Sequence, residues 1–150
     1  MAGFKGQAEY SVDGKGRVPV PAKMRRSVNP DVRDVFTATR GLEPCVYLYP
    51  ADTWEDIELQ IQALNQFDGD ARHFTRMISM WADDVTLDAQ GRAALPKALL
   101  EFAGIQPGSK ALIIGAFDHI EVWDPERFET YLNTQTTSYD VLAQAVMATR

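Results

Sequence analysis

The sequence predicts an α+β fold with a small, closed, pseudo-twofold β unit, since one strand–turn–strand pattern occurs twice in its 150 residues. Residues 10–21 and 85–96 align at a constant offset of 75, with identical Asp, Gly, Arg and final Pro. A second pair of segments, residues 46–55 and 120–129, aligns at an offset of 74. Two similar halves in one chain favour a closed barrel, because closure removes the unpaired edges that an isolated hairpin exposes.

Each copy of the first segment contains the residues of a tight turn between two strands. An aspartate at the start of the turn accepts hydrogen bonds from backbone N–H groups two or three residues later. A glycine before the arginine supplies the positive φ that such a turn commonly needs. We therefore assign a structural role to the two motifs, in which the arginine pairs with the carboxylate; the residues assigned are Asp13, Gly16, Asp88, Gly91 and Arg92.

The segments after each turn predict a strand and a short helix. Pro19 has no N–H group, so its strand is expected to have one unpaired side or to lie beside a bulge. Pro21 and Pro96 precede helix-compatible runs and suit the first helical position. The alternating strands at 46–48 and 120–122 lead into helices expected to begin near Trp54 and Phe128.

Two amphipathic helices are predicted between the copies. Their apolar residues recur at spacings of three and four, in residues 54–64 and 67–81, with a break at 65–69. After a polar, Thr-rich stretch at 133–138, apolar residues at 139, 142 and 146 indicate one weak helix. We expect a single folded unit, divided into a first half (4–52), a helical insert (53–82), a second half (83–132) and a C-terminal tail (133–150).

The composition, with 45% apolar and 24% charged residues, is that of an ordinary globular protein. No apolar run approaches the roughly 20 residues of a membrane span, and the N-terminus lacks the apolar core of a signal peptide, so we expect a cytoplasmic protein without membrane partners. Cys45, the single cysteine, excludes an internal disulfide framework and is expected to be a small buried side chain.

Positive charge is concentrated near the N-terminus. The net charge is −6, yet residues 1–40 carry eight basic against four acidic side chains, which leaves −10 for the remainder. The basic residues are Lys5, Lys15, Arg17, Lys23, Arg25, Arg26, Arg33 and Arg40. An acidic body repels DNA from most faces, so one basic edge can provide both affinity and orientation.

The chain resembles the MraZ family at the paired motifs 13–17 and 88–92, and at residues 39–42, 48–50 and 120–123. The resemblance covers roughly residues 4–132. It implies two AbrB-like halves (SpoVT-AbrB domains) that form a swapped-hairpin barrel, assembled into a ring-shaped homo-oligomer. It also implies a nucleoid-associated transcriptional regulator, expected to be a repressor, that binds G-rich direct repeats in double-stranded DNA upstream of the division and cell-wall gene cluster.

The family's DNA contact corresponds to Arg17, with Lys15 on the same turn. An arginine places two donors on O6 and N7 of guanine, a pairing worth ~1–3 kcal/mol of discrimination. Four further cations, Lys15, Lys23, Arg25 and Arg26, suit phosphates, which add affinity and salt dependence but no sequence information. The expected DNA-binding set is Lys5, Lys15, Arg17, Lys23, Arg25 and Arg26.

The two copies differ in charge. Residues 9–26 carry a net charge of +3 and residues 84–101 carry −1, so we expect only the first copy to bind DNA. Arg92 is expected to act mainly in the structure of its turn, and a contact of Arg92 with DNA is left open.

No enzyme, metal site, cofactor or small-molecule substrate is expected. The carboxylates at 55, 56, 58, 83 and 84 have no paired base, metal motif or phosphate loop beside them, and His73 and His119 are isolated in the sequence. The alternative is an AbrB-type antitoxin or a protein-binding adaptor on the same barrel. Antitoxins usually join one barrel half to a flexible toxin-wrapping tail, whereas this chain contains both halves and a short tail.

Overall fold

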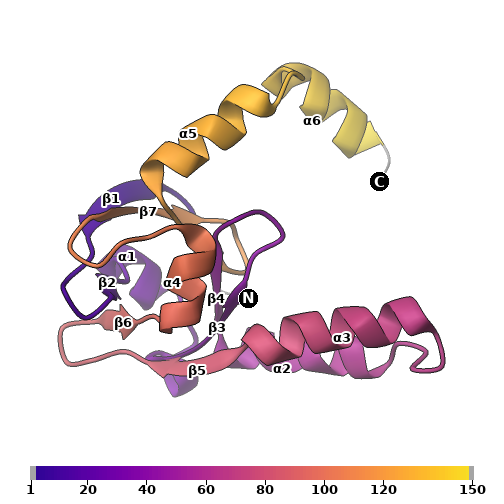
Figure 1. Ribbon diagram of the computed structural model, residues 1–150, viewed down its shortest axis with the longest axis horizontal. Helices are drawn as coiled ribbons and strands as arrows, with labels where there is room; N and C mark the ends of the chain where they lie inside the picture. The colour runs from indigo at the N-terminus through magenta and orange to yellow at the C-terminus, as the bar shows by residue number, and fades with distance from the viewer. Residues whose placement is uncertain (1–2, 149–150) are drawn as a thin grey trace.

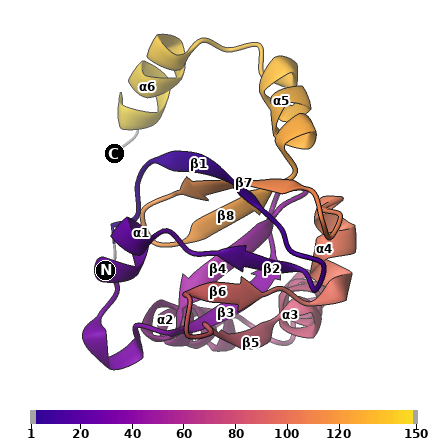
Figure 2. The same cartoon turned by 90° about the vertical axis from the view of Figure 1, so that its left-hand side faces the viewer.

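The computed structural model describes residues 3–148 and has an α+β architecture, as predicted. An antiparallel six-stranded sheet has the strand order β1-β7-β8-β4-β3-β5, and a separate two-stranded ribbon is made by β2 and β6 (Figures 1 and 2). The strands are β1 (Gln7–Ser11), β2 (Arg17–Pro19), β3 (Val35–Arg40), β4 (Val46–Pro50), β5 (Asp83–Thr86), β6 (Arg92–Ala94), β7 (Lys110–Gly115) and β8 (Ile120–Trp123). The helices are α1 (Ala22–Arg26), the 3₁₀ turn η1 (Pro30–Val32), α2 (Ala51–Gln62), α3 (Gly69–Trp81), α4 (Lys97–Ala103), α5 (Pro125–Thr134) and α6 (Tyr139–Ala148).

The two halves of the sequence are interleaved in the strand pairing. The N-terminal strand β1 pairs with β7 of the second half, and β5 of the second half pairs with β3 of the first. The ribbon joins one strand from each half, with Arg17 opposite Ala94 and Pro19 opposite Arg92. Pro19 therefore lies in a strand with one neighbour, as its missing N–H group predicts.

The expected closed barrel is not present in residues 3–148. The six-stranded sheet is open, and its edges are β1 and β5. Each edge strand continues through its aspartate turn into β2 or β6, and these two short strands pair with each other and not with the sheet. The edge strands β1 and β5 therefore do not pair with each other, because the segments that follow them form the separate ribbon.

One large core lies between the sheet and the ribbon. The alternation along β2 and β6 buries Val18 and Ala93 completely, and both pack in the same cluster as Phe36, Leu48 and Ile113. Burial of such side chains is the main favourable contribution to folding. A second cluster contains Cys45, Tyr47 and Trp123. Burial raises the pKa of the Cys45 thiol, in accord with the small buried side chain that the sequence predicted.

The helices begin earlier than the apolar spacing predicted. Pro50 precedes α2, and the Asp124 carboxylate caps α5 by accepting a hydrogen bond from Arg127 N at 3.1 Å. Pro21 and Pro96 are the N-cap residues of α1 and α4 and not their first helical residues. The Asp124 cap accounts for the start of α5. By contrast, α1, α2 and α4 begin directly after a proline and have no side-chain cap.

The helices outside the core form two projections. The predicted pair, α2 and α3, extends as a hairpin from one side of the sheet, while α5 and α6 form an arm on another (Figure 1). α6 confirms the weak helix expected near the C-terminus. In the described part of the chain, no helix combines the length and apolarity that a bilayer crossing needs.

Candidate nucleic-acid interface

The outer face of the β2–β6 ribbon brings the two sequence motifs together. Because side chains alternate along a strand, burial of Val18 and Ala93 turns Arg17 and Arg92 to the opposite face. The ladder is antiparallel, so the turn before β2 and the turn before β6 lie at opposite ends of the ribbon (Figure 2). A two-stranded ribbon of this kind fits the major groove of B-form DNA.

The two turns have the same hydrogen bonds. Oδ1 of Asp13 accepts from Lys15 N and Arg17 N at 2.9 Å, and Oδ1 of Asp88 accepts from Gln90 N and Arg92 N at 2.9 Å. The glycine before each arginine has a φ near +78° or +76°, a conformation that glycine adopts without strain. Both turns are therefore closed by their aspartate through contacts within four residues.

Four charged side chains, Asp13, Arg17, Asp88 and Arg92, form a cluster across the ribbon that we call the Asp–Arg quartet. Within each turn, arginine Nε donates to aspartate Oδ2, at 2.5 Å for Arg17 and 2.9 Å for Arg92. Between the turns, Arg92 Nη1 lies 3.5 Å from Asp13 Oδ2, and Arg17 Nη1 lies 3.9 Å from Asp88 Oδ2. The two acids and the two bases cancel in charge. Each arginine is paired with the aspartate of its own turn and also faces the aspartate of the other turn.

These hydrogen bonds stabilise the charged carboxylates. The pKa of Asp13 is lowered to about 2, first by the backbone N–H of Arg17 and then by its side chain, despite some opposing desolvation. The pKa of Asp88 is lowered by the corresponding groups of Arg92. Both carboxylates of the quartet are therefore charged at neutral pH. Each side chain of the quartet remains about 30% exposed, so each is partly accessible to solvent.

Positive charge from the first half lies beside the turn of the second half. α1 follows β2 and places Arg25 against Gly91, with Arg25 Nε donating to Val20 O at 3.1 Å. A Cβ atom on Gly91 would lie only 2.6 Å from Arg25 Cζ, so the guanidinium covers this glycine. Lys23 and Arg26 are exposed on the same short helix. Basic side chains of the first half therefore also lie beside the second turn.

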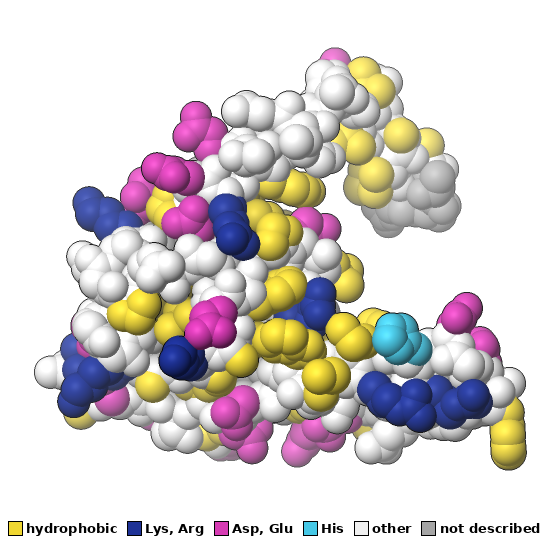
Figure 3. All heavy atoms as spheres, in the orientation of Figure 1, with side chains coloured by type: hydrophobic (Ala, Val, Ile, Leu, Met, Phe, Trp, Pro, Cys, Tyr) yellow, Lys and Arg dark blue, Asp and Glu magenta, His cyan; other side chains and the backbone are white. Residues whose placement is uncertain are grey.

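The first turn has different neighbours. Gly14 and Lys15 line a cavity with Lys97 and Glu101 of α4. Lys15 is exposed, and Lys97 is paired with Glu101 at 4.0 Å. Figure 3 shows Lys and Arg side chains grouped at the left-hand edge, where the ribbon lies, and a second group along α3. Cations therefore flank both ends of the ribbon.

The structure does not bring Lys5 to the ribbon. Lys5 precedes β1, whereas the Asp13 turn follows it, and a strand of this length spans about 17 Å. The backbone of Lys5 lies instead against Gly115, beside the bridge between Phe4 and Phe117. The other predicted DNA-binding residues belong to the ribbon, its first turn and α1, while Lys5 lies at the far end of β1.

Two polar side chains at the ribbon were not singled out by sequence reasoning. Gln90 occupies in the second turn the position of Lys15 in the first, and it accepts a hydrogen bond from Arg92 Nη2 at 2.7 Å. Lys97 lies beside the first turn. The offset of 75 between the copies was the signal that identifies Gln90, whereas the position of Lys97 depends on packing between the halves.

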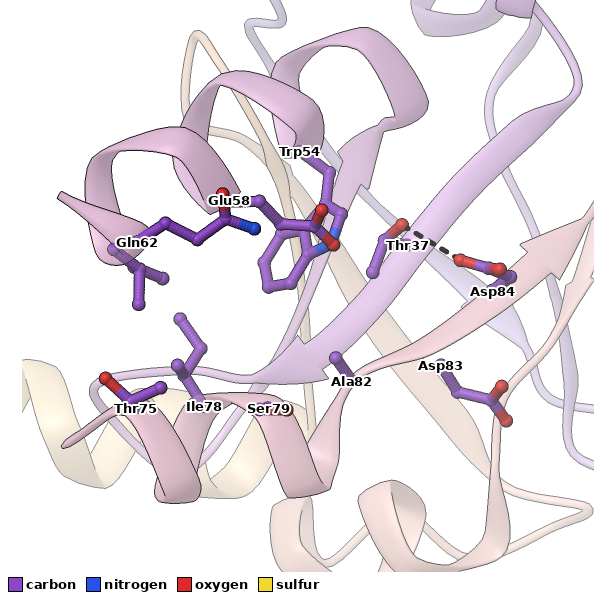
Figure 4. A pocket seen from close by; sticks show the side chains of 11 residues that line it. Thr37, Trp54, Glu58, Gln62, Thr75, Ile78, Ser79, Ala82, Asp83 and Asp84 are labelled. Atoms are coloured by element: carbon purple, nitrogen blue, oxygen red, sulfur yellow. Dashed lines mark hydrogen bonds between the residues drawn. The ribbon is translucent and has the colours of Figure 1, made fainter. Parts of the chain in front are cut away.

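Three of the five carboxylates considered above, Glu58, Asp83 and Asp84, line a separate cavity of about 430 Å³ (Figure 4), whereas Glu55 and Asp56 are exposed on α2. Glu58 accepts a hydrogen bond from Trp54 Nε1 at 2.6 Å, and Asp84 accepts one from Thr37 at 3.4 Å. Asp83 points away from Asp84 in this view. Within residues 3–148, no group of three or more His, Cys, Asp or Glu side chains is arranged to hold a metal ion.

His119 is isolated in the sequence pattern but not in the structure. Its ring lies 2.7 Å from Asp118 Oδ1 and 3.0 Å from Glu121 Oε2, and it packs on Tyr47. Burial disfavours the charged imidazole, but hydrogen bonds to Glu121 and Asp118 outweigh it and raise the pKa of His119. The interaction links the β7–β8 turn to the second core cluster.

Comparisons with known proteins agree with the duplicated motif. A family model described as "MraZ protein, putative antitoxin-like" matches the chain twice, over residues 4–77 and 78–147. Three proteins named transcriptional regulator MraZ are similar over nearly their whole length. The one from Natranaerobius thermophilus is 36% identical over 96% of both chains, that from Syntrophomonas wolfei 37% over 94% of both, and that from Halothermothrix orenii 35% over 95% of this chain and 96% of its own. The name of these relatives, transcriptional regulator, does not describe an enzyme class. The family model and the relatives together show that this chain belongs to the MraZ family.

Proposed function

We propose that this protein is a sequence-specific DNA-binding transcriptional regulator, and that the outer face of the β2–β6 ribbon is its DNA-binding surface. The observation that carries the proposal is the ribbon itself, whose solvent-facing arginines are flanked by cations on a chain with a net charge of −6. Electrostatic attraction to phosphates supplies most non-specific affinity for DNA, and an acidic body disfavours other orientations. The names of the relatives support the same function.

Arg17 is the proposed guanine-reading residue. Its Nε atom is occupied by Asp13, which fixes the plane of the guanidinium, while the side chain stays 30% exposed. Lys15, Lys23, Arg25 and Arg26 are assigned to phosphates. Lys5 is proposed to contact DNA at the other end of β1, away from the ribbon.

The proposed operator consists of G-rich direct repeats upstream of the division and cell-wall gene cluster, with repression as the outcome. One ribbon presents few cations, so tight binding at physiological salt requires several subunits on neighbouring repeats. We therefore propose a ring-like homo-oligomer in the cytoplasm, associated with the nucleoid.

Exposed apolar side chains support self-assembly. Leu42 is 83% exposed, Met80 70% and Tyr139 89%, at sites on the β3–β4 loop, α3 and α6. A groove of about 650 Å³ between α2, α3 and the β3–β4 loop has further apolar lining residues, among them Ile57, Leu64, Phe74 and Met77. Exposed apolar patches of this kind are typical of subunit interfaces.

A gel shift with DNA from upstream of the protein's own gene tests the proposed function at two salt concentrations. Wild type is expected to bind with a clear salt dependence. Arg17→Ala is expected to lose the specific shift, whereas Arg92→Ala is expected to lower stability before it lowers specificity. Arg76→Ala, which removes one exposed cation from α3, is the matched control and is expected to bind as wild type does. Equal binding by Arg17→Ala and wild type would refute the assignment of Arg17.

The alternative function is an antitoxin or protein-binding adaptor, which the description of the family model as antitoxin-like favours. In that case the exposed apolar surfaces of α3 and α6 bind another protein. Co-purification with the product of an adjacent gene, together with no shift of the upstream DNA, supports this alternative. A specific DNA shift without such a complex supports the regulator.

A further inference from the structure

Gln90 is the second turn's counterpart of Lys15. Both follow their aspartate by two residues, both are exposed, and the N–H of each donates to the aspartate Oδ1 at 2.9 Å. The two side chains therefore mark the tips of the two turns, at opposite ends of one ribbon (Figure 2). A lysine suits a phosphate, whereas a glutamine amide carries a donor and an acceptor in one plane.

The side chain of Gln90 is held in place, although it is exposed. Arg92 Nη2 donates to Gln90 Oε1 at 2.7 Å, and Nε of the same guanidinium donates to Asp88 Oδ2 at 2.9 Å. Arg92 in turn lies 3.5 Å from Asp13 of the other turn. A surface glutamine usually loses rotamer freedom when it binds a ligand, and prior fixation reduces that cost.

The Gln90 amide retains the atoms that read a base. A carbonyl oxygen has two lone pairs, and Arg92 occupies one of them. Within residues 3–148, no hydrogen bond is formed by Gln90 Nε2, so its N–H groups are available for a ligand. One acceptor and one donor in this arrangement match N6 and N7 of adenine in the major groove.

The surroundings of Gln90 suit a DNA backbone. Arg25 covers Gly91, the next residue, and Lys23 and Arg26 are exposed on the same helix. The second turn is acidic in its own sequence, but α1 of the first half supplies it with positive charge. A phosphate bound by α1 would therefore lie close to the second turn.

We propose that Gln90 is a second base-reading residue, which accepts a hydrogen bond from N6 and donates one to N7 of an adenine, and that Arg92 is its positioning residue. The proposal rests on the DNA-binding function proposed above. Each ribbon then reads two separated positions, a guanine through Arg17 and an adenine through Gln90, and both halves of the chain contribute to specificity.

Selection from a randomised double-stranded DNA library tests this proposal with the full-length protein. Wild type is expected to enrich a motif with a guanine position and an adenine position. Gln90→Ala is expected to lose about fivefold to 150-fold of preference at the adenine position alone. Gln90→Glu is expected to change that preference to cytosine, whose N4 group donates to a carboxylate.

Two further variants separate reading from folding. Arg92→Lys keeps the charge but not the forked guanidinium, and is expected to weaken the adenine preference while the guanine preference remains. Gln135→Ala, on the exposed end of the α5 arm, is the matched control and is expected to enrich the wild-type motif. Thermal unfolding of each variant shows whether the turn is intact.

The outcomes separate this proposal from the function on which it rests. A wild type that enriches no motif overturns both. A wild-type motif that is unchanged in Gln90→Ala, or weakened equally at every position, overturns the role of Gln90 and leaves the regulator intact. Loss at one adenine position, with a change to cytosine in Gln90→Glu, supports it.

Discussion

The two turns of the ribbon have the same backbone geometry and different neighbours. Each aspartate accepts two backbone hydrogen bonds at 2.9 Å, and each glycine has a positive φ. The first turn, however, packs on Leu100 of α4, whereas the second is covered by Arg25 of α1. The difference shows that each half of the chain supplies the surroundings of the other half's turn.

This exchange changes how the charge of the molecule is interpreted. Along the sequence, the first copy is basic and the second is acidic. In the structure, α1 of the first copy lies beside Gly91 of the second, so the second turn also has basic neighbours. A charge count along the chain therefore describes the composition of each half but not the electrostatic environment of its turn.

The largest expected difference between the turns is in stability. Gly16→Ala is expected to lower the free energy of unfolding by about 2–4 kcal/mol, because overpacking and a positive φ are both unfavourable for alanine. The new Cβ would meet the buried Leu100 side chain at 2.7 Å. Gly91→Ala is expected to lower the free energy of unfolding by about 1–2 kcal/mol. Its cost is smaller because the Arg25 side chain, which the new Cβ would meet, can move away. Urea unfolding of both variants measures the difference.

Gly108→Ala is the matched control for this comparison. Gly108 also has a positive φ, and no atom lies within 4 Å of the position that its Cβ would take. The decrease in the free energy of unfolding of Gly108→Ala reports the conformational contribution alone. It should resemble the decrease caused by Gly91→Ala. If Gly16→Ala costs no more than Gly108→Ala, the contact with Leu100 does not distinguish the two turns.

Local features of the fold could be predicted from the sequence, and contacts between the halves could not. The Asp13 and Asp88 turns depend on hydrogen bonds within four residues, and α2 and α3 follow from apolar spacing, so both could be expected from the sequence. The open sheet and the position of Arg25 beside Gly91 join residues far apart in the chain. No local pattern encodes such pairings. The barrel was predicted to close because closure removes exposed strand edges, and nothing in the sequence indicated that β2 and β6 pair with each other.

The same limit applies to the candidate site. The motif predicted that an arginine pairs with the aspartate of its own turn, and the structure contains both ion pairs. It did not show that each arginine also faces the aspartate of the other turn, or that Arg92 holds Gln90. The alignment of the two copies nevertheless contained the relevant signal, since Gln90 and Lys15 occupy equivalent places.

A second, smaller difference is expected in the dependence of stability on pH. The pKa of Asp13 is lowered in the folded state from 3.8 to about 2. A lowered pKa contributes stability above the unfolded value, and this contribution is lost as the pH falls through the folded value. Wild type is therefore expected to lose stability between about pH 4 and pH 2, and Asp13→Asn to lose less over the same interval.

Asp88→Asn provides the comparison for this measurement. The pKa of Asp88 is lowered by equivalent hydrogen bonds, but its side-chain contact with arginine is longer, at 2.9 Å against 2.5 Å in the first turn. Asp88→Asn is expected to flatten the pH profile less than Asp13→Asn. Thermal unfolding across this pH range tests the order, and identical profiles for Asp13→Asn and wild type contradict it.

The smallest expected difference is in the salt dependence of DNA binding. The slope of log K against log salt changes by about 0.9 for each phosphate that the protein ceases to neutralise. Lys23 and Arg26 are exposed beside the second turn, so the double variant Lys23→Ala/Arg26→Ala is expected to reduce the slope by about 1.8. Lys97→Ala, beside the first turn, is expected to reduce it by at most about 0.9, because Lys97 is paired with Glu101.

The double variant Arg72→Ala/Arg76→Ala removes the same charge from α3, away from the ribbon (Figure 1), and serves as the control. Because exposed charges more than about 10 Å apart are largely screened at about 0.1 M salt, this variant is expected to keep the wild-type slope. An equal decrease in the α1 and α3 double variants would mean that DNA responds to net charge alone. A decrease confined to α1 would show that the first half supplies the phosphate contacts beside the second half's turn.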